Sequence, residues 1–327
     1  MTMTRRVLLE LAAAIGGAIA IPMPVSAQGF PARPVKFVVP YPPGGTTDLI
    51  ARLCGQALVP AWGTAPIVEN RAGASTIIGA EAVSRSSPDG YTLLVTAEAT
   101  FAVNPFIFQT LPYSLSDFVP VSGLAVSTHV LVAHPTFPGN TVDAVVAEAR
   151  RSEGALPYGT FGPGSSGHLN MEMFALASGA KMTPAHYKGA GPMMNDLLAG
   201  HIKLAFTGMS LAAGPIQSGK LKPIAIGATS RNPAFTQIPT IAESGLPGFQ
   251  AISWFGVFAP KGTSEDIVTE INQALQRLLA DSRFQAQHLD PAHLKPLTGT
   301  PADFTAFVRG EAAKWGGIIK AANISVQ

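Results

Sequence analysis

The sequence predicts an α/β fold in which mostly parallel sheets carry helices on their faces. Short apolar runs alternate with amphipathic helical segments along most of the chain, and this alternation favours parallel strands joined by helical crossovers. Several runs lead into the next helix through glycine-rich turns, which are typical of the same fold class. With 327 residues, of which 47% are hydrophobic, the chain is long enough for two domains and too apolar for a disordered protein.

The first 27 residues are predicted to be a signal peptide. Arg5 and Arg6 precede a stretch at 7–21 that is apolar except for Glu10, and residues 25–27 (Val-Ser-Ala) place small side chains before a cleavage site between Ala27 and Gln28. The apolar stretch is shorter than a membrane span, which needs about 20 residues. An uncleaved anchor is the alternative, and the paired arginines also fit twin-arginine export. We therefore expect an exported, periplasmic protein.

The predicted elements follow one another in a regular order. In the first part of the chain, strands are expected at 35–39, 67–69 and 91–96, and helices at 46–58 and 77–85. In the middle part, strands are expected at 155–160, 185–187, 201–206 and 222–228, and helices at 141–151, 166–178, 192–199 and 209–218. The last part is mainly helical, with amphipathic segments at 267–279 and 303–322.

Two apolar stretches, 119–132 and 249–258, are candidate crossings between two lobes. If the chain enters the second lobe in the first stretch and returns in the second, lobe 1 consists of residues 28–127 plus 250–327 and lobe 2 of residues 128–249. Periodicity alone leaves this topology open.

Composition excludes several classes of protein. Only 13% of the residues are charged, and the 22 cations do not gather into the basic stripe that a nucleic-acid binder needs. A single cysteine excludes a disulfide scaffold and a Cys-rich metal site. The sequence also contains no H-E-x-x-H zinc motif and no G-x-S-x-G nucleophile turn. We expect no metal and no catalytic residue.

The first candidate binding element is the turn at 41–48, between a predicted strand and a predicted helix. Its glycines let the backbone approach a ligand, and the start of the helix presents free N–H groups and the positive end of the dipole. One of the cap-type residues at 46–48 is expected to cap the helix. A capped turn without a ligand is the alternative. The candidate ligand-binding residues are Tyr41, Gly44, Gly45, Thr46, Thr47 and Asp48.

A second turn of the same kind lies at 158–168 and also opens a helix. Its candidate ligand-binding residues are Gly164, Ser165, Ser166 and His168. Gly162, Gly164 and Gly167 formally match the dinucleotide fingerprint, but Pro163 interrupts it and no acidic residue follows about 20 positions on. We therefore expect no cofactor. Two such turns on two lobes predict a cleft that holds a small carboxylate between opposed helix ends.

Three further residues follow predicted strands or turns. Glu98 could contact an amino or hydroxyl group of a ligand, although a solvated loop carboxylate is the favoured alternative. Thr207 follows the strand expected at 201–206, where a ligand contact is geometrically reasonable. Lys188 is interpreted as a surface lysine rather than an anion ligand. His168 beside Ser165 or Ser166 leaves a periplasmic enzyme as a rival hypothesis.

Many short motifs in order along the mature chain resemble the Bug-type periplasmic solute receptors, the binding proteins of tripartite tricarboxylate transporters. In the first lobe they are the turn at 41–48, Val68-Glu69-Asn70-Arg71-Ala72-Gly73-Ala74, Ser87-Pro88-Asp89-Gly90-Tyr91-Thr92-Leu93-Leu94, Asn104-Pro105, Leu111-Pro112-Tyr113 and Asp117-Phe118-Val119-Pro120-Val121. Further along they are Tyr158-Gly159, Gly164-Ser165-Ser166-Gly167-His168-Leu169, Tyr187-Lys188-Gly189, Asp196-Leu197-Leu198-Ala199-Gly200, Pro239-Thr240-Ile241-Ala242-Glu243-Ser244-Gly245, Trp254-Phe255-Gly256 and Ala259-Pro260.

The resemblance implies a two-lobed periplasmic-binding-protein fold (type II-like) that closes over a small, usually carboxylated solute. It implies that the turns matching 41–48 and 164–168 hold the carboxylate of the ligand, partly through water. The solute would be a dicarboxylate, tricarboxylate, amino acid or aromatic acid, and the partners would be the membrane subunits of the transporter. A receptor that feeds a signalling sensor is a further alternative, and we expect a monomer.

Two positions depart from the family pattern. Thr207 stands where Asp or Asn is common, and Glu98 stands where neutral residues are usual. Both are therefore candidates for selecting the solute.

Overall fold

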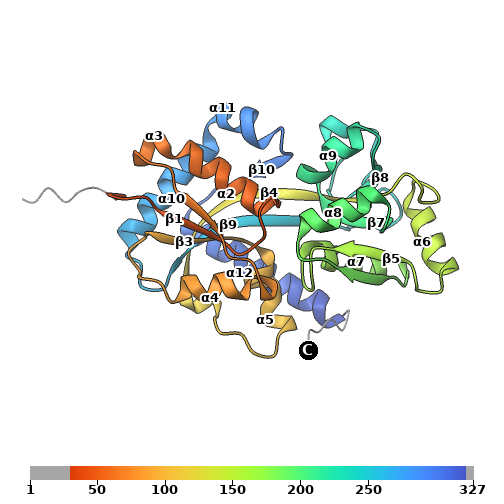
Figure 1. Cartoon of the computed structure of the whole chain (residues 1–327), viewed down its shortest axis with the longest axis horizontal. Coiled ribbons are helices and arrows are strands. Elements are labelled where there is room, and N and C mark those ends of the chain that lie inside the picture. Colours follow the sequence, from red (N-terminus) through yellow and green to blue (C-terminus); the bar gives the residue numbers. More distant parts are fainter. Residues whose placement is uncertain (1–29, 322–327) are drawn as a thin grey trace, which may run out of the picture. The chain divides into compact units, whose positions relative to one another are not determined.

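Two long strands, β4 (Phe118–Ala133) and β9 (Ile252–Pro260), lie where the chain passes between two α/β lobes (Figure 1). The computed structural model describes residues 30–321, so the predicted signal peptide at 1–27 lies outside the described residues. As far as Thr128, β4 pairs antiparallel with β9, and from His129 onward it pairs antiparallel with β7 (Leu204–Gly208). The two apolar stretches predicted as crossings fall in β4 and β9.

Lobe 1 contains three parallel strands in the order β2-β1-β3. The strand β9 extends this sheet antiparallel to β3, and β10 pairs antiparallel with β4. The strands are β1 (Lys36–Val39), β2 (Ile67–Asn70), β3 (Thr92–Ala97) and β10 (Leu294–Pro296). The helices are α2 (Thr46–Ala57), α3 (Val59–Trp62), α4 (Ile77–Ser84), α5 (Asn104–Ile107), α10 (Glu265–Ala280), α11 (Ser282–Phe284) and α12 (Pro301–Ala321).

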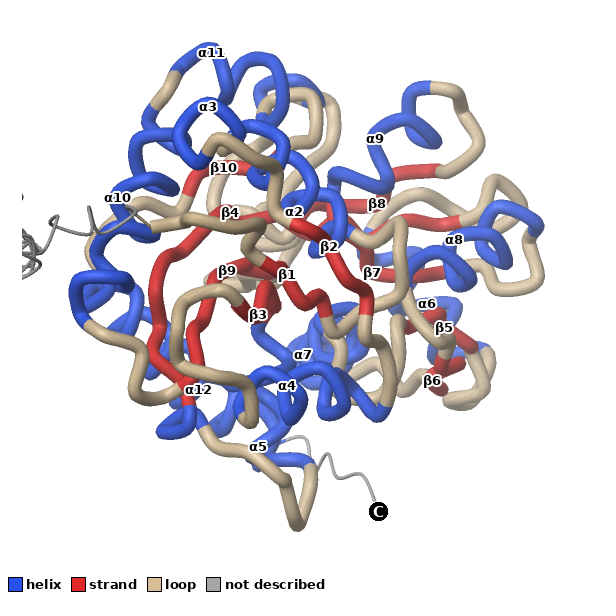
Figure 2. The backbone as a smooth tube through the Cα atoms, turned by 60° about the vertical axis from the view of Figure 1, so that its left-hand side comes forward, coloured by secondary structure: helices blue, strands red, loops and turns tan. Residues whose placement is uncertain are grey.

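Lobe 2 repeats the arrangement, with parallel strands in the order β7-β5-β6 and with β7 and β8 both antiparallel to β4 (Figure 2). Its remaining strands are β5 (Pro157–Thr160), β6 (Thr183–His186) and β8 (Lys222–Ile226). Its helices are α6 (Val142–Arg151), α7 (Ser166–Ser178), α8 (Ala190–Ala199) and α9 (Met209–Gln217). The predicted fold class is confirmed, and the strands at the crossings add antiparallel pairs that periodicity does not reveal.

The order of strands fixes where a ligand can bind in each lobe. In lobe 1 the chain runs from β1 to β2 on one side and then crosses to β3 on the other side of β1. In lobe 2 it runs from β5 to β6 and then crosses to β7 in the same way. Parallel sheets bind ligands at the carboxyl ends of strands at such a switch point. The two glycine-rich turns follow β1 and β5, and both predicted binding elements therefore stand at switch points.

Each lobe has its own apolar core. In lobe 1, Trp254 on β9 packs edge-on against Phe304 of α12, with ring centroids 5.9 Å apart. Gly256 permits this packing, because a Cβ there would lie 2.1 Å from the Phe304 ring. In lobe 2, Phe206 stacks on Phe249 with ring centroids 6.1 Å apart. Burying each ring stabilises its lobe by about 2–3 kcal/mol and gives the turns a firm support.

From Arg33 onward the chain forms one compact unit that contains both lobes. No helix in the described part of the chain has both the length and the hydrophobicity that a membrane span needs.

Candidate functional site

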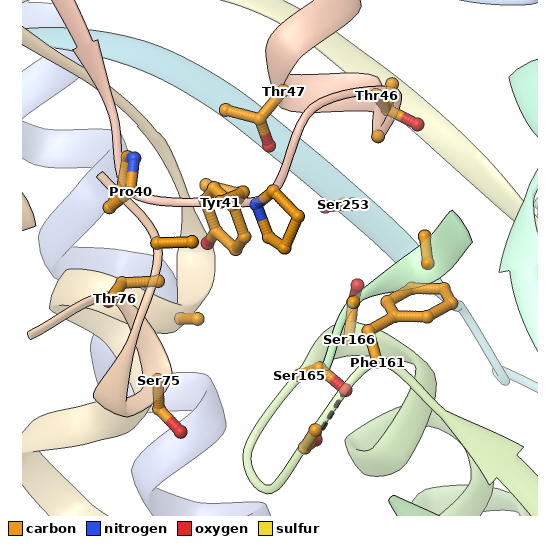
Figure 3. Close-up of a pocket in the computed structure, with 18 of the residues that line it drawn as sticks. Pro40, Tyr41, Thr46, Thr47, Ser75, Thr76, Phe161, Ser165, Ser166 and Ser253 are labelled. Carbon is orange, nitrogen blue, oxygen red and sulfur yellow. Dashed lines mark hydrogen bonds between the residues drawn. The ribbon is translucent and has the colours of Figure 1, made fainter. Parts of the chain in front are cut away.

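A cavity of about 700 Å³ lies between the lobes and is lined from both. Figure 3 shows its two sides: Tyr41, Thr46 and Thr47 come from the turn after β1, and Phe161, Ser165 and Ser166 come from the turn after β5. The two predicted binding elements therefore meet across one cavity.

Five helices begin at this cavity. The residue that precedes the first turn of each helix is among the lining residues, and these five are Gly45 for α2, Thr76 for α4, Ser165 for α7, Gly189 for α8 and Gly208 for α9. The first N–H groups of a helix have no partner inside it, and its dipole is positive at this end. Among the described lining residues the only charged side chains are Glu98 and Lys188, and Lys188 is exposed. The positive potential therefore comes mainly from backbone groups.

The turn after β1 is held by the carboxylate of Asp48, in the first turn of α2. Its Oδ2 accepts from the backbone N–H of Gly44 at 3.0 Å, and its Oδ1 accepts from the Asn70 amide at 2.9 Å. Arg52 completes the arrangement with an ion pair at 2.9 Å. Although burial raises the pKa of Asp48, the hydrogen bonds from Arg52, Gly44 and Asn70 outweigh it and hold the pKa below its usual value. Asp48 is charged and holds the turn rather than facing the cavity.

The expected side-chain cap of α2 is wrong. The N-cap residue is Gly45, which has no side chain, and no side-chain cap is formed there. Asp48 instead accepts a hydrogen bond from the N–H of Gly44, which lies before the N-cap residue and has a left-handed conformation (φ 85°).

The turn after β5 is held by His168, in the first turn of α7. Its Nδ1 accepts from the backbone N–H of Gly164 at 3.1 Å, and burial lowers its pKa to about 4, with a further contribution from His186. The ring is therefore neutral near pH 7. The Ser165 hydroxyl donates to the Gly162 carbonyl at 2.7 Å and accepts from the N–H of His168 at 3.4 Å, which caps α7.

Ser165 and His168 do not form a serine–histidine pair through their side chains. The Ser165 hydroxyl contacts backbone groups only, and the imidazole of His168 is committed to Gly164 on one side and lies 3.9 Å from the Glu172 carboxylate on the other. No group of three or more His, Cys, Asp or Glu side chains suited to a metal occurs among the described residues.

A third wall of the cavity comes from Ala74, Ser75 and Thr76, which form the short helix η1 (Ala74–Thr76). All three have positive φ, at 44°, 50° and 80°. Such a conformation costs about 1–3 kcal/mol per non-glycine residue and persists only where the surroundings impose it. Here the amide of Asn104 donates to the Ser75 carbonyl at 2.7 Å and contacts the Thr76 hydroxyl at 3.2 Å. Local strain is thus retained at the cavity wall.

Glu98 lies at the end of β3 and is 2% exposed, so its interpretation as a solvated loop carboxylate is wrong. It lines the cavity, and its Oε2 accepts from the Ser253 hydroxyl at 2.5 Å and from the backbone N–H of Trp254 at 3.3 Å. Burial raises the pKa of this carboxyl. On the strand β4, His129 also lines the cavity, and burial lowers its pKa to about 3, so its ring is neutral.

The structure brings seven of the predicted ligand-binding residues to the cavity and leaves five outside its lining. Those in the lining are Tyr41, Gly45, Thr46, Thr47, Glu98, Ser165 and Ser166. Those outside it are Gly44, Asp48, Gly164, His168 and Thr207. Four of the five face into their own turns, because Asp48 and His168 bind Gly44 and Gly164. Thr207 is fully buried in β7, and its hydroxyl has no partner among the described residues.

Sequence reasoning missed other lining residues. They include Ala72, Gly73, Ala74, Ser75, Thr76, His129, Phe161, Gly189, Gly208, Leu211, Ser253 and Phe255. The segments at 72–76 and 187–190 each join a strand to a helix, so the argument used for the two glycine-rich turns could have found them. His129 and Ser253 lie inside strands and give no such signal.

Comparison with known proteins agrees with this geometry. Residues 50–324 match the family described as the tripartite tricarboxylate transporter family receptor. The chain is 38% identical to Protein BugT of Bordetella pertussis over 98% of both chains. Among solved structures, R. palustris Rpa4515 with adipate is 34% identical with a TM-score of 0.87, covering 90% of this chain and 99% of that one. MatC (Rpa3494) from Rhodopseudomonas palustris, with bound malate, is 29% identical with a TM-score of 0.83, covering 89% and 100%. The chain therefore belongs to the receptor family of tripartite tricarboxylate transporters, as its Bug-type motifs predicted.

Proposed function

We propose that the protein is a periplasmic receptor that captures a small carboxylated metabolite between its lobes and delivers it to the membrane subunits of a tripartite tricarboxylate-type transporter. The observation that carries this proposal is the convergence of five helix N-termini on one interlobe cavity. Free N–H groups and helix dipoles together favour a carboxylate there. The similar proteins solved with adipate and with malate support the same class of solute.

We assign the ligand contacts to the lining residues of the two turns. Thr46, Thr47, Ser165 and Ser166 offer hydroxyls beside the free N–H groups of α2 and α7, and Gly45 leaves room for the ligand to approach. Gly44, Asp48, Gly164 and His168 act by shaping the turns. The cavity lining gives no support to the predicted contact of Thr207.

Capture by closure is supported by two contacts between the lobes. The hydroxyls of Thr46 on α2 and Ser210 on α9 lie 2.9 Å apart, and the Ser75 hydroxyl donates to the Pro163 carbonyl at 3.3 Å. We propose that the lobes comprise residues 28–127 plus 250–327 and residues 128–249. The change of pairing partner in β4 between Thr128 and His129 supports this division.

We further propose that the receptor acts as a monomer without catalysis. The absence of a hydrogen bond between Ser165 and the His168 ring in the described chain disfavours the enzyme hypothesis. Release of the unmodified solute from the protein, detected by native mass spectrometry, is expected. Conversion of that solute by the purified protein would contradict a receptor without catalysis.

The anion site is tested by adding a negative charge to each turn. Gly45→Glu and Ser166→Asp are each expected to abolish carboxylate binding in calorimetry, because the new carboxylate occupies the helix N-terminus that the ligand needs. Gly45→Glu should fold. Gly45 has φ −83° and ψ 170°, which any residue adopts, and a Cβ there would lie 3.9 Å from the nearest heavy atom.

A matched control is Gly310→Glu on α12, which makes the same change where a Cβ meets no heavy atom within 4 Å. This variant should bind like the wild type. Unchanged affinity in either turn variant would contradict the proposed carboxylate site.

A further inference from the structure

Residues of β9 hold the Glu98 carboxyl group from one side. Ser253 and the N–H of Trp254, both on β9, bind Oε2. The Ser166 hydroxyl and the backbone N–H of Glu98 itself also hydrogen-bond this carboxyl group, and the side chain lines the cavity. Glu98 also precedes the π-helical turn η2 (Ala99–Val103), and such turns frequently occur at functional sites. The carboxyl group is therefore held in one orientation beside the ligand space.

The start of α7 lies beside Glu98. Burial raises the pKa of Glu98, and a hydrogen bond from the Ser166 hydroxyl, in the first turn of that helix, lowers it. A carboxylate of the solute bound to the N–H groups of α7 would consequently lie next to Glu98. None of the ion pairs in the described chain includes Glu98, so no cation among the described residues pairs with it.

Two acceptor groups placed side by side in a buried site repel one another, because each desolvated carboxylate needs donors. The conflict disappears when the solute places a hydrogen-bond donor between its own carboxylate and Glu98. An amino group does this best, because it brings both donors and a positive charge, and a hydroxyl group brings one donor.

Resting on the proposed function, we propose that Glu98 is a specificity-determining residue that accepts a hydrogen bond from an amino or hydroxyl group next to the bound carboxylate. The preferred solutes are then amino or hydroxy acids, and carboxylates without a donor bind more weakly.

The test measures binding of matched solutes that differ only in the donor, using calorimetry on the full chain and its variants. The matched sets are succinate, malate and aspartate; adipate and 2-aminoadipate; tricarballylate and citrate; benzoate and 2-aminobenzoate. In the set that contains the tightest-binding solute, the donor-bearing member should bind at least about tenfold more tightly than the donor-free one. This factor is what a hydrogen bond to a charged group implies.

Glu98→Gln should remove at least about tenfold of the affinity for an amino-bearing solute and leave the donor-free solute unchanged or tighter. Ser253→Ala removes one hydrogen bond to Oε2 and should reduce the preference for donor-bearing solutes by a smaller factor. This variant replaces Glu98→Gln in the test if Glu98→Gln does not fold. Glu270→Gln on the exposed face of α10 is the matched control and should change neither affinity.

The outcomes separate the two proposals. Binding of none of these carboxylates would contradict the proposed function itself. Tight binding of donor-free solutes in the wild type, or an equal loss for all solutes in Glu98→Gln, would overturn the role of Glu98 while leaving the receptor function intact.

Discussion

The two glycine-rich turns use the same construction with different chemistry. In each, a glycine with positive φ donates its N–H to a side chain four residues later, which is the third residue of the following helix. Gly44 donates to Asp48 in lobe 1, and Gly164 donates to His168 in lobe 2. Both turns then present the start of a helix to the cavity. The construction, more than the identity of any residue, sets where the free N–H groups point.

The difference between the turns lies in charge. Asp48 is a carboxylate with three partners, and its negative charge suits the positive end of α2. His168 is a neutral ring, and protonation at the start of α7 would be unfavourable for the same reason. The turn of lobe 1 is therefore held by a charged side chain, and the turn of lobe 2 by a neutral one. The two should respond differently to mutation and to pH.

The largest expected effect is that of Asp48→Ala. This change leaves the Gly44 N–H and the Asn70 amide without their buried acceptor, so the free energy of unfolding should fall by about 3 kcal/mol. Arg52→Ala is the control, because its side chain is 52% exposed and its loss should cost less than about 1 kcal/mol. Urea unfolding measures both. If both variants lose the same free energy of unfolding, the stabilisation comes from the ion pair with Arg52 and not from the hydrogen bonds that hold the turn.

The second effect is that the two turns lose their contributions to stability at different pH values. The pKa of His168 falls from 6.5 in the unfolded chain to about 4 in the folded protein, so between these values the unfolded state binds more protons and stability falls as pH falls. This residue should remove about 2 kcal/mol of stability between about pH 7 and about pH 5. The depressed pKa of Asp48 acts only at lower pH, because its contribution is lost as pH falls through its folded value, below 3.8.

His168→Asn tests this difference, because the Asn side chain keeps an acceptor for Gly164 and does not titrate. Thermal or urea unfolding of the variant should show a pH dependence flatter than that of the wild type by about 2 kcal/mol over the same range. The slope that remains is expected to come from His129, His186 and His293, whose pKa values burial also lowers. An unchanged slope in His168→Asn would contradict the assignment.

The comparison also shows what sequence can reveal. The helix predicted at 166–178 is observed at Ser166–Ser178, because its serine cap and its following glycine both signal helix ends. The cavity wall at Ala74–Thr76 was missed, since Ala, Ser and Thr carry no signal for positive φ. That conformation is imposed by Asn104, about 30 positions along the chain. The same limit applies to Glu98, whose buried carboxyl group accepts a hydrogen bond from Ser253, 155 positions away.

The smallest expected effect concerns the N-caps, where the turns differ by one side chain. Ser165 caps α7 and Gly45 leaves α2 without a side-chain cap, so Ser165→Ala should cost about 1 kcal/mol and Gly45→Ser should add a few tenths. Gly45→Ser requires no change of backbone, since φ is −83° and ψ is 170°. Its hydroxyl, however, would accept from N–H groups that the proposed ligand needs. Calorimetry should therefore show weaker carboxylate binding in a more stable protein. If affinity and stability rise together, the free N–H groups of α2 do not bind the solute, and the helix-end site belongs to lobe 2 alone.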